Sequence, residues 1–171
     1  NPLLQDFDLP PFSAIKPEHV VPAIDQLLAD SRKQVAELLQ RKGGFTWDNL
    51  VLPMDEMAAK LGQAWSPVSH LNAVCNNAEL REAYEACLPK LSEFWTEMGQ
   101  NRELFNAYKA LADSPAAGEL NDAQRKVLDN ELRDFHLSGI DLPAAQQARY
   151  GEIQKELSEL SSRFSNQLLD A

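Results

Sequence analysis

The sequence predicts an all-α protein, a helical bundle or array of roughly five to seven helices, several of them kinked by proline. Apolar residues recur at steps of three and four along most of the 171 residues. No stretch alternates apolar and polar residues for long enough to predict a strand. Glycine, proline and asparagine divide the chain into segments of helical length, and no repeat of fixed period indicates a solenoid.

Residues 1–16 are expected to form an extended N-terminal arm. Pro10-Pro11 cannot continue a helix, and Pro17 restricts the residue before it to extended conformations. Four apolar side chains should hold the arm against a neighbouring surface: Phe7, Leu9, Phe12 and Ile15. Residues 17–171 are then expected to form one helical lobe.

The first two helices are bounded by recognisable residues. Proline is favoured at the first helical position, so the first helix should begin at Pro17, and Gly43-Gly44 should stop it. Thr46 is the expected N-cap of the second helix. Pro53 should kink or split that helix, and Ser66-Pro67 should end it. A short helical turn is expected over residues 68–74.

The middle of the chain predicts a long helix followed by a short one. Asn77 should cap the long helix, Pro89 should kink it, and Gly99 should close it. Asn101 should cap the short helix, and residues 114–118 should form a loop. Broad apolar faces accompany both helices, with Leu80, Tyr84, Cys87, Leu88, Leu91, Phe94, Trp95 and Met98 on the first and Leu104, Phe105, Tyr108 and Leu111 on the second.

Two further helices complete the prediction. Asn121 and Gln124 resemble a capping box, and Pro143 should open the last helix after a turn at residues 138–142. The apolar period of the last helix is formed by Tyr150, Ile153, Leu157, Leu160, Phe164 and Leu168. This period still runs at Leu169-Asp170-Ala171, where no glycine, proline or basic residue marks a stop. We therefore expect a last helix truncated at the C-terminus, in a fragment of a longer protein.

Composition disfavours several classes of partner. Lys and Arg number 16 against 26 Asp and Glu, and the net charge is −10. Nucleic acids and anionic membrane surfaces both require positive charge, so we expect binding to neither. No apolar stretch is long enough to span a membrane, and the first residues lack a signal-peptide pattern. Cys75 and Cys87 fall on apolar helix sides and are expected to be reduced structural thiols, which fits a cytoplasmic location.

No catalytic, cofactor-binding or metal-binding set of residues is complete. His19, His70 and His136 are far apart in sequence, and the zinc-peptidase signature His-Glu-x-x-His is absent. The pairs of Glu-x-x-His that build di-iron bundles are also absent. There is no Gly-x-Ser-x-Gly elbow and no phosphate-binding glycine loop. We therefore assign no catalytic, cofactor or metal residue to this chain; a tertiary three-histidine site and a cysteine nucleophile remain minor alternatives.

Two constellations have both a structural and a functional interpretation. Trp47, Trp65 and Trp95, with Phe94, could form a ligand cage, but their helical spacing favours packing in the core. A second constellation is the row of charges Glu152, Lys155, Glu156, Glu159 and Arg163 on the last helix. It is typical of a solvated face with pairs at i,i+3 and i,i+4, and a charged groove wall is the alternative.

Several segments, in order, resemble one family of peptidases. They are Leu9-Pro10-Pro11-Phe12-Ser13 leading into Pro17-Glu18-His19-Val20-Val21-Pro22-Ala23, then Ser66-Pro67-Val68-Ser69-His70-Leu71-Asn72, Glu79-Leu80-Arg81-Glu82-Ala83-Tyr84, Leu132-Arg133-Asp134-Phe135 with Ser138-Gly139-Ile140, and Tyr150-Gly151-Glu152-Ile153 running to Phe164-Ser165-Asn166. Together they resemble the N-terminal region of the bacterial oligopeptidase A family, in the thimet oligopeptidase and neurolysin group of zinc metallopeptidases.

The resemblance implies a fold and an activity for a longer parent protein. Enzymes of this group are almost entirely helical, and two lobes flank a deep channel that admits short peptides. The catalytic lobe holds zinc through His-Glu-x-x-His and a later Glu. The resemblance thus implies that this chain is a non-catalytic lobe, inactive alone, which walls the channel and partners the missing C-terminal catalytic domain. A free-standing helical binding or scaffold protein is the alternative, and a cryptic metalloenzyme is a third.

Overall fold

The computed structural model describes residues 1–170, which fold into six α-helices without any strand. The all-α prediction is therefore confirmed. The α-helices are α1 (Pro17–Leu39), α2 (Leu52–Val74), α3 (Ala78–Gly99), α4 (Arg102–Ala112), α5 (Asp122–Leu137) and α6 (Ala144–Leu169). Short helical turns are η1 (Pro2–Leu4), η2 (Phe12–Ala14), the π-helical η3 (Trp47–Val51) and η4 (Pro115–Glu119).

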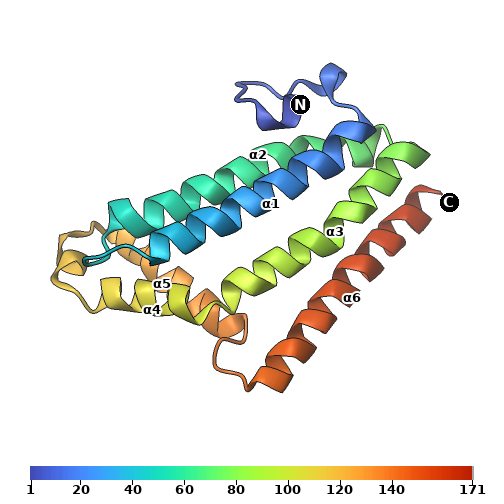
Figure 1. Ribbon diagram of the computed structural model, residues 1–171. Coiled ribbons are helices and arrows are strands. Elements are labelled where there is room, and N and C mark those ends of the chain that lie inside the picture. The colour runs from blue at the N-terminus through green and yellow to red at the C-terminus, as the bar shows by residue number, and fades with distance from the viewer. Residues whose placement is uncertain (171) are drawn as a thin grey trace.

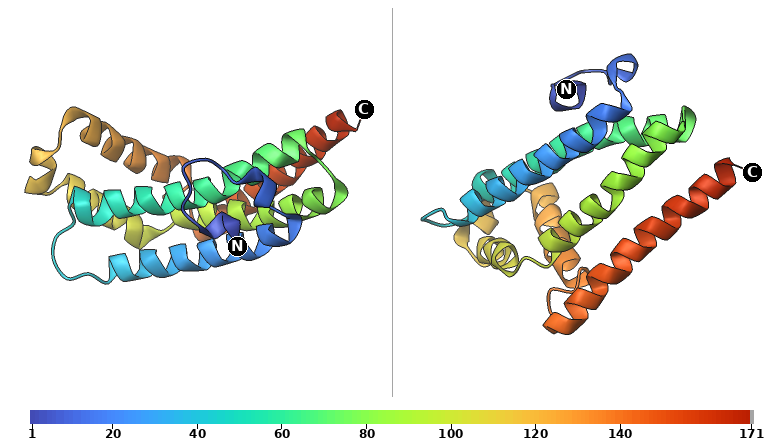
Figure 2. Two further views of the ribbon diagram at one scale, coloured as in Figure 1. Left: turned by 90° about the horizontal axis from the view of Figure 1, so that it is seen from above. Right: turned by 45° about the vertical axis from the view of Figure 1, so that its right-hand side comes forward.

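The long helices run side by side and the two short ones close one end. Helices α1, α2 and α3 pack together, and α6 packs along α3 (Figure 1). The pair α4 and α5 lies at the end where α3 finishes, while the N-terminal arm lies at the opposite end (Figure 2). The C-terminal end of α6 returns to the beginning of α3, so α6 stands at the margin of the bundle (Figures 1 and 2).

Side-chain caps start three of the six α-helices where the sequence predicts them. Asn77 and Asn101 each accept a hydrogen bond at 2.9 Å from the backbone N–H three residues later. Asn121 and Gln124 form the predicted capping box. Thr46 also forms a capping box, with Asn49, but the turn that it caps is the π-helical η3. These bonds satisfy N–H groups that a helix start leaves free.

One predicted helix end is wrong, and one predicted loop has regular structure. Ser66-Pro67 does not end the second helix, because α2 continues through Pro67 to Val74. The proline removes one backbone bond, but Pro67 and Val68 are both buried, and their packing offsets that loss. Residues 114–118 are not an open loop either, since most of them belong to the 3-10 turn η4.

The N-terminal arm contains two 3-10 turns and packs through a few apolar side chains. Leu3 and Ile15 are buried in the cluster formed by α1, α2 and α3, whereas Leu9 is 82% exposed. Asn1 caps the first turn and donates a hydrogen bond to the carbonyl of His19. The arm is thus tied to the beginning of α1.

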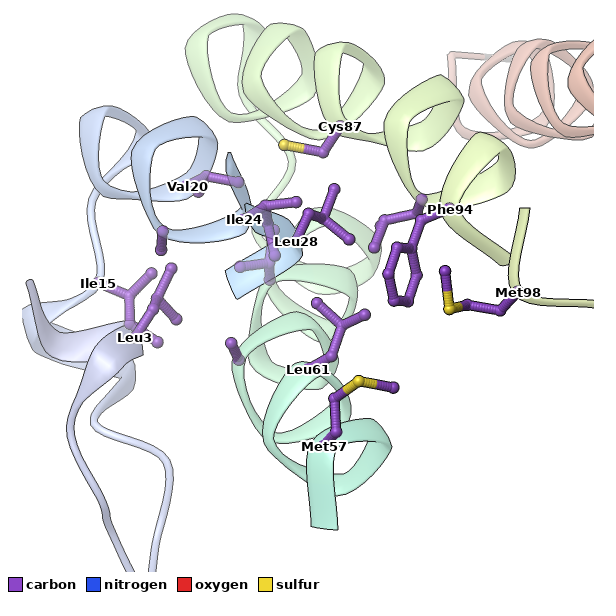
Figure 3. Packing of buried hydrophobic residues seen from close by; sticks show 14 of the residues in the cluster. Leu3, Ile15, Val20, Ile24, Leu28, Met57, Leu61, Cys87, Phe94 and Met98 are labelled. Atoms are coloured by element: carbon purple, nitrogen blue, oxygen red, sulfur yellow. The ribbon is translucent and has the colours of Figure 1, made fainter. Parts of the chain in front are cut away.

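Two hydrophobic clusters hold the fold together. The larger is shared by α1, α2 and α3, where Ile24, Leu28, Leu61 and Phe94 converge (Figure 3). The smaller joins α4 and α5 to η3 and to the end of α1. Helix α6 contributes no buried residue to either cluster. None of the helices in residues 1–170 combines the length and apolar character that a membrane-spanning segment requires.

Candidate functional site

The candidate site is a groove along one face of the bundle, which we name the tryptophan groove. Its long part has a volume of about 420 Å³ and lies between α2, α3 and α6. Each of the three helices lines it with four residues at positions i, i+3, i+4 and i+7, the spacing of one helical face. They are Ala58, Leu61, Gly62 and Trp65 from α2, Leu88, Leu91, Ser92 and Trp95 from α3, and Gln154, Leu157, Ser158 and Ser161 from α6.

The long part of the groove is neutral. None of its twelve lining residues carries a charge, and its polar side-chain groups are three hydroxyls, one amide and two indole N–H groups. Trp65 stacks on Tyr84, with ring centroids 4.8 Å apart, while Trp95 packs edge-on against Phe94. A largely apolar lining with a few hydroxyl groups suits an uncharged, extended ligand.

At one end the groove opens into an acidic pocket. Two adjoining cavities of about 260 and 270 Å³ share Met54, Trp95, Tyr108 and Glu131, and the first of them also shares Ala58 with the long part. Trp47 and Asp55 line the first cavity and Asp134 lines the second. No Lys or Arg lines either cavity in the described part of the chain, so the local charge is negative.

The ionisable groups of the acidic pocket are perturbed. Burial raises the pKa of Glu131, and the charges of Asp134 and Asp55 raise it further. The pKa of Tyr108 is raised by burial and, to a smaller extent, by Glu131 and Asp55. Asp134 is paired with Arg133 at 2.8 Å, whereas neither Glu131 nor Asp55 belongs to an ion pair within residues 1–170. Two of the three carboxylates of the pocket, Glu131 and Asp55, are therefore without a cationic partner in this part of the chain.

A third cavity, of about 430 Å³, lies between α3 and α6, and its lining includes two residues of the charged row of α6. Glu152 and Lys155 line it together with Glu93 and Glu97 of α3. Glu152 pairs with Arg149 at 2.9 Å, and Glu97 pairs with Arg32 of α1 at 2.8 Å. All five residues of the row are exposed, as a solvated face predicts, and two of them also line this cavity, as a groove wall predicts.

Polar contacts hold α6 at its two ends. Arg81 of α3 donates two hydrogen bonds to the carboxylate of Asp170, at 2.7 and 2.8 Å. At the other end, the side chain of Gln147 donates to the carbonyls of Gly139 and Ile140, both at 3.1 Å. The backbone is tight there: a Cβ on Gly99 would lie 2.5 Å from the Ser138 hydroxyl, and Gly139 has φ +84°. One wall of the groove is therefore anchored mainly at its ends.

The three histidines lie in separate places. His19 accepts a hydrogen bond from the backbone of Lys16, and the ring of His70 lies 5.3 Å from that of Phe12. His136 contacts the Asp141 carboxylate in the turn before α6. Within residues 1–170, no group of three or more His, Cys, Asp or Glu side chains is placed to hold a metal ion.

The two cysteines differ in environment. Cys87 is buried among α1, α2 and α3, as expected, and its pKa is raised to about 11, chiefly by burial (Figure 3). Such a thiol stays protonated and unreactive at neutral pH. The expectation of an apolar helix side is wrong for Cys75, which is exposed at the end of α2.

Core packing holds for three of the four aromatic residues, including Trp47, which packs against the smaller cluster. Phe94 is fully buried and Trp65 packs against the larger cluster, as core packing predicts. Trp95 is 45% exposed, so the core prediction is wrong for that residue. The three indoles form no closed cage and instead follow one another along the groove.

Sequence reasoning missed the acidic pocket. Tyr108 was expected only as an apolar residue of a short helix, and Asp55 and Glu131 were not singled out. A signal was present for Glu131, because it interrupts the apolar stripe of Leu128, Leu132 and Phe135 on α5. A carboxylate at such a position faces the bundle and indicates either a buried partner or a site.

Comparison with known proteins agrees with the resemblance seen in the sequence. The chain is 53% identical over its whole length to oligopeptidase A of Haemophilus influenzae, 35% to a probable cytosolic oligopeptidase A of Arabidopsis thaliana and 26% to a dipeptidyl carboxypeptidase of Salmonella typhimurium. It spans 25%, 24% and 26% of these proteins respectively. The family model described as the N-terminal domain of neurolysin and thimet oligopeptidase matches residues 24–147. The chain therefore belongs to the family of neurolysin/thimet oligopeptidase N-terminal domains.

Proposed function

We propose that this chain is the non-catalytic N-terminal lobe of a zinc-dependent oligopeptidase, and that the tryptophan groove forms part of the wall of its substrate channel. The observation that carries the proposal is the 53% identity to an oligopeptidase A along the entire chain, which spans only 25% of that relative. Short peptides are the proposed substrates of the longer protein, and this lobe is inactive alone.

The shape and chemistry of the groove support a role in peptide binding. An extended peptide advances about 3.3 Å per residue and presents side chains on alternate sides. Hydroxyl groups of Ser92, Ser158 and Ser161 can bond its backbone, while indole rings contact its side chains. A groove between helices admits an extended chain but not a folded domain, so it would select short or unfolded substrates.

Zinc does not fit the residues of this chain. Its usual ligands are three or four converging His, Cys, Asp or Glu side chains, and residues 1–170 contain no such group. We place the zinc ligands and the catalytic residues in the C-terminal catalytic domain of the longer protein. That domain is also the proposed partner of α6, whose Leu160, Phe164 and Leu168 are 48%, 69% and 70% exposed.

We also propose a cytoplasmic location. The free thiols of Cys75 and Cys87 suit a reducing compartment, and the name of the Arabidopsis thaliana relative contains the word cytosolic. Neither nucleic acid nor membrane is a proposed partner, because the net charge is −10.

The gene and a peptidase assay test this function. The reading frame should continue beyond position 171 and encode His-Glu-x-x-His. The longer protein should cleave a quenched fluorescent peptide in the presence of zinc, and the 171-residue chain should not. A stop codon at this position would instead favour a free-standing scaffold, and turnover by the short chain at the rate of the long one would disprove the non-catalytic role.

A further inference from the structure

The acidic end of the tryptophan groove carries negative charge without a cation. Glu131 and Asp55 line the same cavity, and neither has an ion-pair partner in the described part of the chain. Three carboxylates elsewhere on this protein form ion pairs with a neighbouring helix: Asp25 with Lys90, Glu97 with Arg32 and Asp170 with Arg81. Glu131 has no such pair, although it lies where burial makes an unpaired charge costly.

Tyr108 provides an independent indication that the pocket binds a polar group. The residue is only 2% exposed, and it lines both cavities of the acidic pocket. Its ring packs edge-on against Phe135 at 5.6 Å, which fixes the phenol. Its hydroxyl is not one of the fully enclosed polar atoms that lack a partner, which fits a group that is reached from the cavity. Buried phenols normally bond a partner, so this hydroxyl is available to a group that enters the pocket.

The walls of the pocket are aromatic. Trp47 and Trp95 line the same cavity as Glu131, and Tyr108 lies between its two compartments. The faces of indole and phenol rings attract cations, and arginine stacks on them more readily than lysine does. Negative charge, aromatic walls and a phenol hydroxyl together suit a planar guanidinium.

We propose that this pocket binds the arginine side chain of a peptide whose backbone lies in the neutral part of the tryptophan groove. Glu131 pairs with the guanidinium, Trp47 and Trp95 flank it, and the Tyr108 hydroxyl accepts one of its N–H groups. A cavity of about 260 Å³ accommodates one such side chain, and Trp95 and Ala58 line both the pocket and the groove. The inference rests on the proposed peptide-binding function and adds a preference for one substrate side chain.

Calorimetric titration of the 171-residue chain tests this site without any need for catalysis. The probe is an N-acetylated, C-amidated pentapeptide with arginine at its centre and alanine at the other positions. Replacing arginine by citrulline, which has the same shape but no charge, should weaken binding about tenfold, as should Glu131→Gln. Tyr108→Phe should weaken it by a smaller factor, about three- to fivefold.

Asp129→Asn is the matched control for Glu131→Gln. Asp129 lies on the same helix, is exposed and lines neither cavity, and its replacement changes the net charge by the same amount. It should alter binding less than about twofold. Circular dichroism checks that each variant is folded.

Three results would overturn the proposal. They are equal binding of the citrulline peptide, unchanged binding by Glu131→Gln, and equally tight binding of an all-alanine peptide with a free N-terminus. The last result would assign the pocket to a terminal ammonium instead. Failure of the peptidase proposal is recognised separately, since it depends on the reading frame beyond position 171 and not on this titration.

Discussion

At the scale of single residues, Glu131 carries an electrostatic cost in the folded protein. It is a carboxylate on the inner side of α5, next to Asp55 and Asp134 and half-buried beside Tyr108. A residue chosen only for stability at this position would be neutral or apolar. Binding sites commonly retain such groups at the expense of stability.

Replacing Glu131 by Gln should therefore stabilise the protein at neutral pH. The raised pKa means that the folded state binds this proton more tightly than the unfolded chain does. The free energy of unfolding consequently falls as pH rises through the ordinary glutamate pKa of 4.5 and up to the folded-state value. Urea denaturation should show a higher free energy of unfolding for Glu131→Gln than for the unchanged protein at about pH 7, and almost no difference at about pH 3.5.

Asp129→Asn serves again as the control, because the Asp129 side chain is exposed. It should change stability little at either pH. A loss of stability for Glu131→Gln at neutral pH would show that the carboxylate has a partner that stabilises its charge.

At the scale of elements, α3 is two-sided, and adjacent residues belong to different surfaces. Phe94 is fully buried against α1 and α2, while Trp95 is 45% exposed and lines the groove. The rotation of about 100° between successive helical residues accounts for this difference. The larger of the two aromatic side chains is thus the less important for folding.

The two aromatics should respond very differently to truncation. Phe94→Ala leaves a cavity in the larger cluster and should cost about 3–5 kcal/mol. Trp95→Ala should cost about 1 kcal/mol, although it removes more atoms. Urea denaturation followed by circular dichroism compares the two variants without relying on indole fluorescence. Equal costs would mean that Trp95 belongs to the core and does not line an open groove.

The elements themselves were largely predictable from sequence, because their signals are local. Asn77, Asn101 and Asn121 cap the backbone within three residues of themselves, and these starts were correctly predicted. Pro67 was misjudged because its tolerance depends on burial against other helices, which no local rule contains. The groove depends on how three helices lie beside one another, so its residues could be placed on helices but not brought together.

At the scale of the whole molecule, α6 is the most weakly held long helix. It buries no residue in either cluster and is tied to α3 by Arg81 with Asp170 and by Asn166 with Glu85. The first contact is an ion pair and the second a hydrogen bond, and both lie near the C-terminal end of the helix. Opening of α6 should therefore need less free energy than unfolding of α1, α2 and α3.

Amide hydrogen exchange should reveal this hierarchy. The amides of α6 should exchange faster than those in the middle of α1 and α3, and Arg81→Gln should speed exchange further in the last turns of α6. Hydrogen bonds from Arg81 lower the pKa of Asp170. The stabilisation of α6 by this pair is therefore fully present above the ordinary carboxyl pKa of 3.8, and it is lost as pH falls through the lower folded-state pKa.

Lys33→Gln is the control for this experiment. It removes a surface pair with Glu37 on α1, 3.8 Å apart, and should leave exchange in α6 unchanged. Protection of α6 equal to that of α1 would contradict the hierarchy.

The weak attachment of α6 has a consequence for ligand binding. Leu157, Ser158 and Ser161 of α6 form one wall of the tryptophan groove, so a ligand that touches both walls can bind only while α6 is docked. Ligand binding in the groove and docking of α6 on the bundle are then thermodynamically linked, so each must favour the other. A ligand at a concentration of ten times its dissociation constant would add about 1.4 kcal/mol to the free energy required to open α6. Occupancy of the groove could thus be measured as slowed exchange of a helix that contributes nothing to the core.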